Sequence, residues 1–387
     1  MASPERKQLT VNDHLFGPGP KRMLALDGGG VRGILSLGYL SHIEQILQKR
    51  NGNDFRLCDY FDLIGGTSTG AIIATALALG FRVEEIQELY RQLAKEIFKK
   101  PFWSLGLIGS KFPKDPLEQA LRERFGETTL GSEQLRTGLM IVTKRLDTGS
   151  PWVIHNSSRG LFFDIPGKGS TASPNRDFEL RHVIRASTAA PHYFEPERLE
   201  VTPGLEGAFV DGGMSPFNNP ALQMLFVATL GGFGLKWPLG AENLLLVSVG
   251  TGYRELRLLP EEVMKMPAGL LALRALGSLM ADCDRLTQTI LQWMSDSPTR
   301  WEINQEIGDL QGNLLGGLQW LSYLRYNVHL VDGWLKEKLN IELNEQEVSA
   351  LYDMDAPRHM EKLEEIAEVA ASAQVKPEHF PKGFDIS

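Results

Sequence analysis

Short apolar runs alternate with longer stretches of helical spacing along the first two thirds of the chain. Met23–Leu26 is a run that predicts a buried strand, and the apolar positions of Ile34–Leu47 fall on a helical stripe. The same strand-turn-helix unit returns at Leu63–Leu79, and Val83–Lys99 continues as an amphipathic helix. Further strands are expected at Leu139–Thr143, Trp152–Ile154 and Leu244–Val249. This alternation predicts an α/β fold with a mostly parallel sheet flanked by helices on both faces.

The pattern becomes mainly helical from about Leu256 onward. Helices are expected at 261–280, 284–294 and 360–373, and the apolar run Trp320–Leu330 is interpreted as one more strand. We therefore divide the chain into three parts. These are an N-terminal arm (1–22), a main α/β domain (23–255) and a mainly helical C-terminal region (256–387) that packs on it.

Composition narrows the class of protein. A chain of 387 residues, 42% of them hydrophobic and 23% charged, can bury a large core and still carry an elaboration. The formal net charge of −8 argues against binding to nucleic-acid polymers. Cys58 and Cys283 suggest neither a disulfide framework nor a zinc site, and Met1–Arg22 has no apolar run of signal-peptide length. A reduced, cytoplasmic protein fits these features best.

The first motif is Asp27–Gly33, with the sequence Asp-Gly-Gly-Gly-Val-Arg-Gly, placed between the first predicted strand and helix. Consecutive glycines expose backbone N–H groups at a helix N-terminus, which forms a cradle for an anion. Two anions fit: a bound phosphate, or the oxyanion formed when a serine attacks an ester carbonyl. The glycines also match the dinucleotide-binding spacing, but neither Asp54 nor Asp59 ends an obvious second strand, as that motif requires. A nucleotide-binding protein using Gly28–Gly33 is therefore the alternative interpretation.

The second motif places Ser68 at the centre of Gly66–Gly70, between an apolar approach and the uncharged stretch Ala71–Leu77. The order strand, sharp turn, helix is typical of a nucleophile elbow, and the flanking glycines let the backbone bend tightly enough to expose the serine. A serine in this position is also a common helix N-cap. The strand before it and the small-residue helix after it favour the nucleophile.

The third motif, Asp211-Gly212-Gly213, follows the apolar residues Ala208–Val210, which would deliver the aspartate to the end of a strand. By itself, Asp-Gly indicates only a turn. A serine nucleophile, however, needs a base within hydrogen-bond reach. The histidines beyond the aspartate have no supporting motif, and they are His329, His359 and His379.

Together, Asp27–Gly33, Gly66–Gly70 and Asp211–Gly213 resemble, in this order, the three signatures of patatin-like phospholipases. Ala186–Phe194 is also similar to the family's segment leading toward its catalytic aspartate. The resemblance covers roughly Met23–Pro220, over half of the chain. It implies a patatin-like fold, with 23–255 as the catalytic domain.

The resemblance further implies a Ser-Asp dyad that cleaves phospholipid esters, as a phospholipase A does. Ser68 would attack the acyl carbonyl to form an acyl-enzyme, and Asp211 would accept the serine proton. The resemblance places the oxyanion at the backbone N–H groups of Gly28, Gly29 and Gly30, and it implies neither a metal nor a cofactor. Arg32 would stabilise the glycine loop or a lipid phosphate, or form a salt bridge on its helix. The remaining supporting residues are Gly66, Gly70 and Gly212.

The implied partner is the phospholipid of a membrane, contacted transiently from its inner, cytoplasmic face. Lys99–Phe112 mixes lysines with Phe102, Trp103 and Ile108, a composition that favours contact with anionic headgroups and the lipid interface. A lid packed over the active site is an equally good interpretation of this segment.

The C-terminal region suggests regulation. Its segments Asp282–Met294, Trp301–Leu310 and Tyr323–Leu330 resemble bacterial patatin-like enzymes that act as effectors of cyclic-nucleotide anti-phage signalling. This resemblance implies a dormant enzyme switched on by a cyclic dinucleotide. A housekeeping role and a secreted toxin stay open as alternatives.

Overall fold

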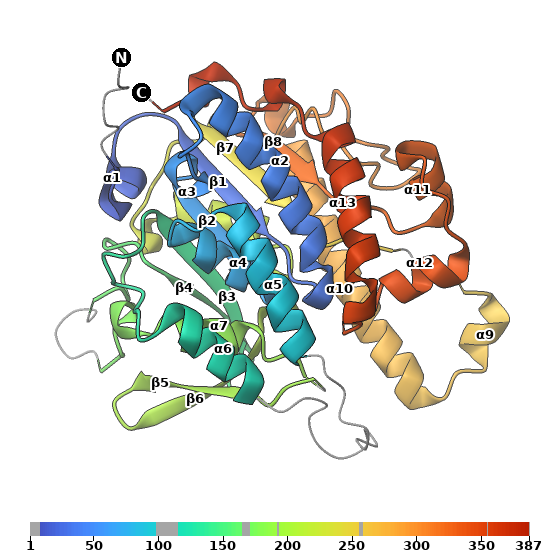
Figure 1. Cartoon of the computed structure of the whole chain (residues 1–387), viewed down its shortest axis with the longest axis horizontal. Coiled ribbons are helices and arrows are strands. Elements are labelled where there is room, and N and C mark those ends of the chain that lie inside the picture. The colour runs from blue at the N-terminus through green and yellow to red at the C-terminus, as the bar shows by residue number, and fades with distance from the viewer. Residues whose placement is uncertain are drawn as a thin grey trace.

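The computed structural model describes residues 8–97, 115–164, 171–191, 193–254, 258–353 and 355–386. An eight-stranded sheet with the order β5-β6-β3-β2-β1-β7-β8 runs through the molecule, and β4 pairs with β3 (Figure 1). The pairs β3-β2, β2-β1, β1-β7 and β7-β8 are parallel, whereas β4, β5 and β6 add antiparallel pairs. The strands are β1 Lys21–Leu26, β2 Leu63–Thr67, β3 Gly138–Arg145, β4 Ser150–His155, β5 Glu197–Thr202, β6 Leu205–Asp211, β7 Leu244–Val249 and β8 Ser322–Tyr326.

Helices cover both faces of this sheet, as the alternating pattern predicts. Figure 1 is seen from the side of α2, α4, α5 and α13, which lie in front of the sheet. The described helices are α1 Val11–Phe16, α2 Gly33–Asn51, α3 Leu57–Tyr60, α4 Thr69–Ala78, α5 Val83–Ile97, α6 Asp115–Phe125, α7 Leu180–Ser187, α8 Ala221–Thr229, α9 Pro260–Met264, α10 Ala268–Trp293, α11 Asp332–Leu339, α12 Glu345–Leu351 and α13 Met360–Gln374.

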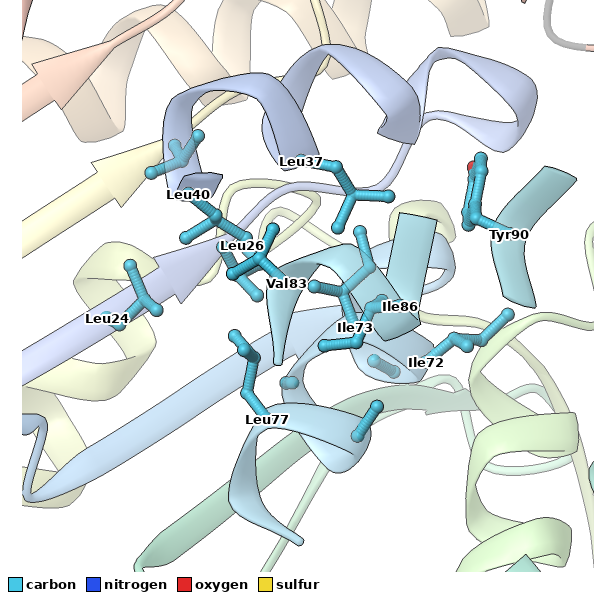
Figure 2. Close-up of a cluster of buried hydrophobic side chains, with 14 of the residues drawn as sticks. Leu24, Leu26, Leu37, Leu40, Ile72, Ile73, Leu77, Val83, Ile86 and Tyr90 are labelled. Atoms are coloured by element: carbon cyan, nitrogen blue, oxygen red, sulfur yellow. The ribbon is translucent and has the colours of Figure 1, made fainter. Parts of the chain in front are cut away.

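Strand β1 shows how the apolar pattern builds two cores. All six of its residues are buried, and successive side chains point to opposite faces of the sheet. Leu24 and Leu26 pack into the core beneath α2, α4 and α5 (Figure 2), while Met23 and Ala25 pack into a second core with α8. A strand that is buried on both faces is a nearly continuous apolar run, which is why it is visible in the sequence.

The C-terminal region is built into the same sheet and its helical cover. Strand β8 pairs in parallel with β7, so the predicted strand within Trp320–Leu330 is present. Helix α13 packs on α2, where a Cβ added to Gly38 would lie 2.5 Å from the Ala367 Cβ. Gly38 therefore allows the two helices to approach closely.

The break in the C-terminal helices lies at a different place from the one predicted. The sequence pattern predicts helices at 261–280 and 284–294, whereas the structure has the short α9 followed by the continuous α10. Pro267 precedes α10, and a proline has no N–H and disfavours helical backbone at the residue before it. Asp282 and Asp284 lie inside α10 without interrupting it.

The sequence-based expectations include contact with a membrane. The proposed docking segment Lys99–Phe112 lies outside the described residues. Among the helices that the structure describes, none combines the length and the apolar character needed to cross a membrane.

Candidate active site

Ser68 lies in a tight turn between β2 and α4. Its backbone has φ 54° and ψ −123°, a conformation that residues other than glycine rarely adopt. Both flanking glycines are required by packing, because a Cβ on Gly66 would overlap the Gly70 carbonyl and a Cβ on Gly70 would overlap the Leu26 carbonyl. The turn holds the serine at the carboxyl end of the parallel strands, as the nucleophile-elbow prediction requires.

Asp211 is the last residue of β6, and its carboxylate lies beside the serine. The Ser68 hydroxyl donates to Asp211 Oδ2 at 2.6 Å, and the Gly213 N–H donates to Oδ1 at 2.7 Å. Burial raises the pKa of Asp211 to about 6, although these two hydrogen bonds favour the charged form. A hydroxyl bonded directly to a buried carboxylate of raised pKa is a suitable arrangement for proton transfer.

Gly212 gives Asp211 its position. A Cβ at Gly212 would overlap the Val142 carbonyl on β3, so only glycine lets β6 turn this close to β3. Strand β6 pairs with β3 at Thr143, directly opposite Asp211. The sheet therefore places the aspartate next to β2 and its serine.

Ser187 fixes the serine turn from the side of α7, and the sequence reasoning missed it. Its Oγ accepts the Ser68 N–H at 2.9 Å and donates to the Val142 carbonyl at 2.6 Å. The residue is fully buried. A signal was available, since Ser187 belongs to the stretch Ala186–Phe194 that resembles a family segment, but nothing in that stretch indicated a contact with Ser68.

The glycine loop lies against the same serine. A Cβ added to Gly28 would lie 3.1 Å from the Ser68 Cβ. The Gly28 N–H donates to the Asn218 carbonyl at 3.1 Å, while its own carbonyl accepts from Asn218 and Thr251. Within the described residues, the N–H groups of Gly29 and Gly30 have no hydrogen-bond acceptor. The loop beside Ser68 thus carries two backbone N–H groups that are unused within the described residues.

Arg32 joins the glycine loop to the C-terminal region. Its guanidinium donates to the Gly252 carbonyl at 2.8 Å and lies 4.1 Å from the ring centroid of Tyr352. The side chain is buried. Of the roles considered for Arg32, these contacts agree with stabilisation of the loop.

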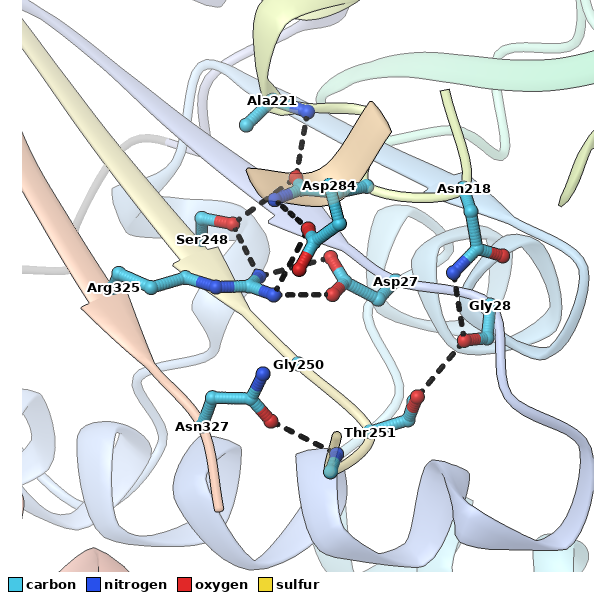
Figure 3. A network of polar contacts seen from close by, with 12 residues as sticks. Asp27, Gly28, Asn218, Ala221, Ser248, Gly250, Thr251, Asp284, Arg325 and Asn327 are labelled. Carbon is cyan, nitrogen blue, oxygen red and sulfur yellow. Dashed lines mark hydrogen bonds and ion pairs between the residues drawn. The ribbon is translucent and has the colours of Figure 1, made fainter. Parts of the chain in front are cut away.

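A buried ion pair lies behind the glycine loop (Figure 3). Arg325 of β8 donates to both carboxylate oxygens of Asp27, at 3.0 and 2.6 Å, and to Ser248 at 2.8 Å. Asp284 of α10 lies 3.5 Å from the same guanidinium. Burial alone would lower the pKa of Arg325, but Asp27 and Asp284 outweigh it and the pKa is raised. From the sequence, Arg325 is expected only to lie in the strand within Trp320–Leu330, and its ion pair is not predicted.

The histidines considered as alternative bases are engaged elsewhere. His379 contacts the Tyr326 hydroxyl at 2.8 Å, His359 contacts Arg358 at 3.0 Å, and His329 stacks on Tyr253 with ring centroids 4.3 Å apart. Among the described residues, the partner of the Ser68 hydroxyl is Asp211.

The chain is similar to a known protein family and to several curated proteins. A family model described as patatin-like phospholipase matches residues 24–225. Patatin-like protein 1 of Arabidopsis thaliana is 31% identical over 255 residues, which cover 59% of this chain and 58% of that protein. A cGAMP-activated phospholipase of Escherichia coli (strain TW11681) is 34% identical over 52% of this chain and 53% of its own length, and one of Vibrio cholerae is 32% identical over 52% and 55%. The chain thus spans little more than half the length of these curated relatives.

Proposed function

The chain belongs to the patatin-like phospholipase family, and on that basis we propose that it is a lipid acyl hydrolase that cleaves ester bonds of membrane phospholipids. The observation that carries the proposal is the 2.6 Å hydrogen bond from Ser68 to the buried Asp211 carboxylate, beside a loop with free backbone donors. These are the nucleophile, base and oxyanion donors that acyl transfer needs.

In the first half-reaction, the Ser68 Oγ forms a bond to the acyl carbon while its proton passes to Asp211. The tetrahedral intermediate then breaks the bond between the acyl carbon and the alcohol oxygen of the lysolipid, and Asp211 returns the proton to that oxygen. The products are an acyl-enzyme and a lysolipid. In the second half-reaction, water attacks the acyl carbon, Asp211 takes the water proton, and the fatty acid leaves as the proton returns to Ser68.

The oxyanion forms on the side of the glycine loop. Gly29 and Gly30 supply N–H groups that have no other acceptor within the described residues. The Gly28 N–H already donates to the Asn218 carbonyl, and this hydrogen bond fixes the loop. Donors that are already oriented stabilise the developing charge without reorganisation in the transition state. Arg32, Gly66, Gly70 and Gly212 support this geometry.

A fluorophosphonate probe and defined phospholipid vesicles test the proposal. Wild type is expected to be labelled and to release fatty acid, Ser68→Ala to do neither, and Asp211→Asn to lose at least about 10³-fold in kcat while remaining folded. Circular dichroism supplies the control for folding. Equal labelling of wild type and Ser68→Ala would refute the nucleophile and favour the alternative of a nucleotide-phosphate site at Gly28–Gly33.

We further propose that a cyclic dinucleotide activates the enzyme. The support is similarity to two proteins named cGAMP-activated phospholipase, at 34% and 32% identity. Such activation would give the chain a role in anti-phage defence. The test is vesicle hydrolysis with and without cGAMP, at matched enzyme concentration. Equal rates under both conditions would refute activation by this ligand and leave the hydrolase proposal intact.

A further inference from the structure

Helix α9 and the first part of α10 form an exposed apolar arm. Met264 is 85% exposed, and Leu270, Leu271 and Leu279 are 46%, 44% and 58% exposed. Between 267 and 281 the only charged residue is Arg274. Apolar side chains gathered on an exposed element mark a site of interaction with a protein or a membrane.

The apolar side chains of the arm point in several directions. At about 100° per residue, Leu270, Leu271 and Leu279 lie at about 0°, 100° and 180° around the helix axis. None of the three belongs to either hydrophobic core of the described residues. A helix that lies in the membrane interface buries a broad apolar face at the boundary between headgroups and acyl chains, and the exposed leucines of the arm, spread over about 180°, form such a face.

The arm extends from the edge of the sheet that carries Ser68. Toward its C-terminal end, α10 is anchored in the protein, because Leu291 packs with Met23 and Leu246 of the sheet. Further toward its N-terminus, Asp284 contacts Arg325 and Asn219 beside Asp27, at the carboxyl ends of β1 and β8. The residues before Asp284 therefore continue past that edge for about 24 Å, and Figure 1 shows α9 and this part of α10 standing out from the body.

We propose that residues 259–281 are the lipid-docking arm of this protein and insert into the interfacial region of a phospholipid bilayer. The inference rests on the proposed function, because it gives the hydrolase its access to substrate. Docking by the arm turns the carboxyl edge of the sheet, and with it Ser68, toward the lipid surface. A second copy of the chain bound at the arm would instead cover this edge.

The variant that tests the arm is Leu270→Gln/Leu271→Gln/Leu279→Gln. Glutamine keeps the side-chain length and is a good helix former, so the exposed helix should persist. The matched control is Leu146→Gln/Leu161→Gln/Leu205→Gln, which changes three leucines of similar exposure, 56%, 59% and 54%, outside the arm.

Binding to phosphatidylcholine vesicles is measured by flotation in a Ser68→Ala background, so that the result does not depend on hydrolysis. We expect the arm variant to bind at least tenfold more weakly, and the control variant to bind as the parent does. In the active background, vesicle hydrolysis by the arm variant should fall by a similar factor. Hydrolysis of a short-chain ester below its micellar concentration should stay unchanged.

Two outcomes overturn the proposal. One is vesicle binding that the arm substitutions leave unaltered. The other is a parent protein that is dimeric by light scattering and becomes monomeric in the arm variant, since the arm would then be an interface between copies. A wild-type protein that binds vesicles through the arm but hydrolyses neither substrate would refute the proposed function and leave the docking arm in place.

Discussion

Two buried aspartates stand at the same edge of the sheet, and their surroundings differ in one respect. Asp27 directly follows β1 and contacts the guanidinium of Arg325, while Asp211 is the last residue of β6 and contacts the hydroxyl of Ser68 and one backbone N–H. Both carboxylates are almost completely buried, 5% and 6% exposed. Within the described residues Asp211 contacts no cation, whereas Asp27 accepts two hydrogen bonds from the Arg325 guanidinium.

This difference separates a structural carboxylate from a reactive one. A carboxylate paired with a buried arginine is fixed in place, and losing its partner would leave an uncompensated charge in the interior. Burial raises the pKa of both carboxylates, that of Asp27 to about 7 and that of Asp211 to about 6, so the pKa does not separate them. Asp211 differs in having the Ser68 hydroxyl at 2.6 Å, from which it can accept a proton. The comparison teaches that burial alone does not identify the base, whereas the partner does.

The largest effect expected from this comparison is on stability, at the Asp27 ion pair. Arg325→Met should lower the free energy of unfolding by about 3–5 kcal/mol, because it leaves Asp27 buried without a cation. Urea denaturation at pH 7, followed by circular dichroism, measures the change. The double variant Asp27→Asn/Arg325→Met should lose less free energy of unfolding than the two single variants lose together.

Arg198→Met is the matched control for this experiment. Arg198 forms an exposed ion pair with Glu206, and such pairs contribute about 0–1 kcal/mol. If Arg325→Met lowers the free energy of unfolding by no more than Arg198→Met does, the buried Asp27 does not need its arginine for stability. The distinction between the two aspartates would then fail.

A smaller effect with the opposite sign is expected at Asp211. The pKa of Asp211 is raised from 3.8 to about 6 in the folded protein, so the folded state binds this proton more tightly than the unfolded state does. As the pH rises through this window, the unfolded state releases the proton first and wild type loses stability. Asp211→Asn carries no charge and avoids the loss. It should therefore be more stable than wild type by up to about 3 kcal/mol at pH 7, and equal to it below about pH 4.

Urea midpoints of wild type and Asp211→Asn, measured at several pH values, test this prediction. The difference between the two proteins isolates Asp211 from other titrating groups. An Asp211→Asn variant that is less stable than wild type at pH 7 would show that the carboxylate contributes more to folding than its burial costs.

The smallest expected effect is the pH dependence of catalysis. Only the ionised form of Asp211 can accept the serine proton, and burial raises its pKa to about 6. The value of kcat/KM should therefore be constant above about pH 7 and fall below about pH 6, approaching tenfold per pH unit. The measurement uses a soluble ester, so that vesicle binding does not enter. Activity that stays constant down to pH 4.5 would contradict Asp211 as the base.

Much of the fold is readable from the sequence because its strands are buried on both faces. The central strands β1, β2, β3 and β7 are apolar runs, and each can be located from a few adjacent residues. The positions of Ser68 and Asp211 follow in the same way, since Ser68 directly follows β2 and Asp211 is the last residue of β6. Local sequence also marks the turns, because glycines lie on both sides of Ser68 and directly after Asp211.

The contacts that support the site depend on distant partners and have no local signal. Ser187 reaches the Ser68 N–H from α7, and Arg325 reaches Asp27 from β8. A lone arginine in an otherwise apolar strand does indicate a buried charge that needs an acid. Which acid it meets depends on the strand order β1-β7-β8, and that order becomes known only with the structure.

The separation of Asp27 and Arg325 by 298 residues has a consequence for the chain during its synthesis. The glycine loop and the Ser68 turn are synthesised before the arginine that pairs with Asp27, because that arginine belongs to β8. A growing polypeptide therefore carries its nucleophile turn without the ion pair behind the glycine loop until β8 has been made. The contacts that support the site from behind the glycine loop can therefore form only once β8 has joined the sheet.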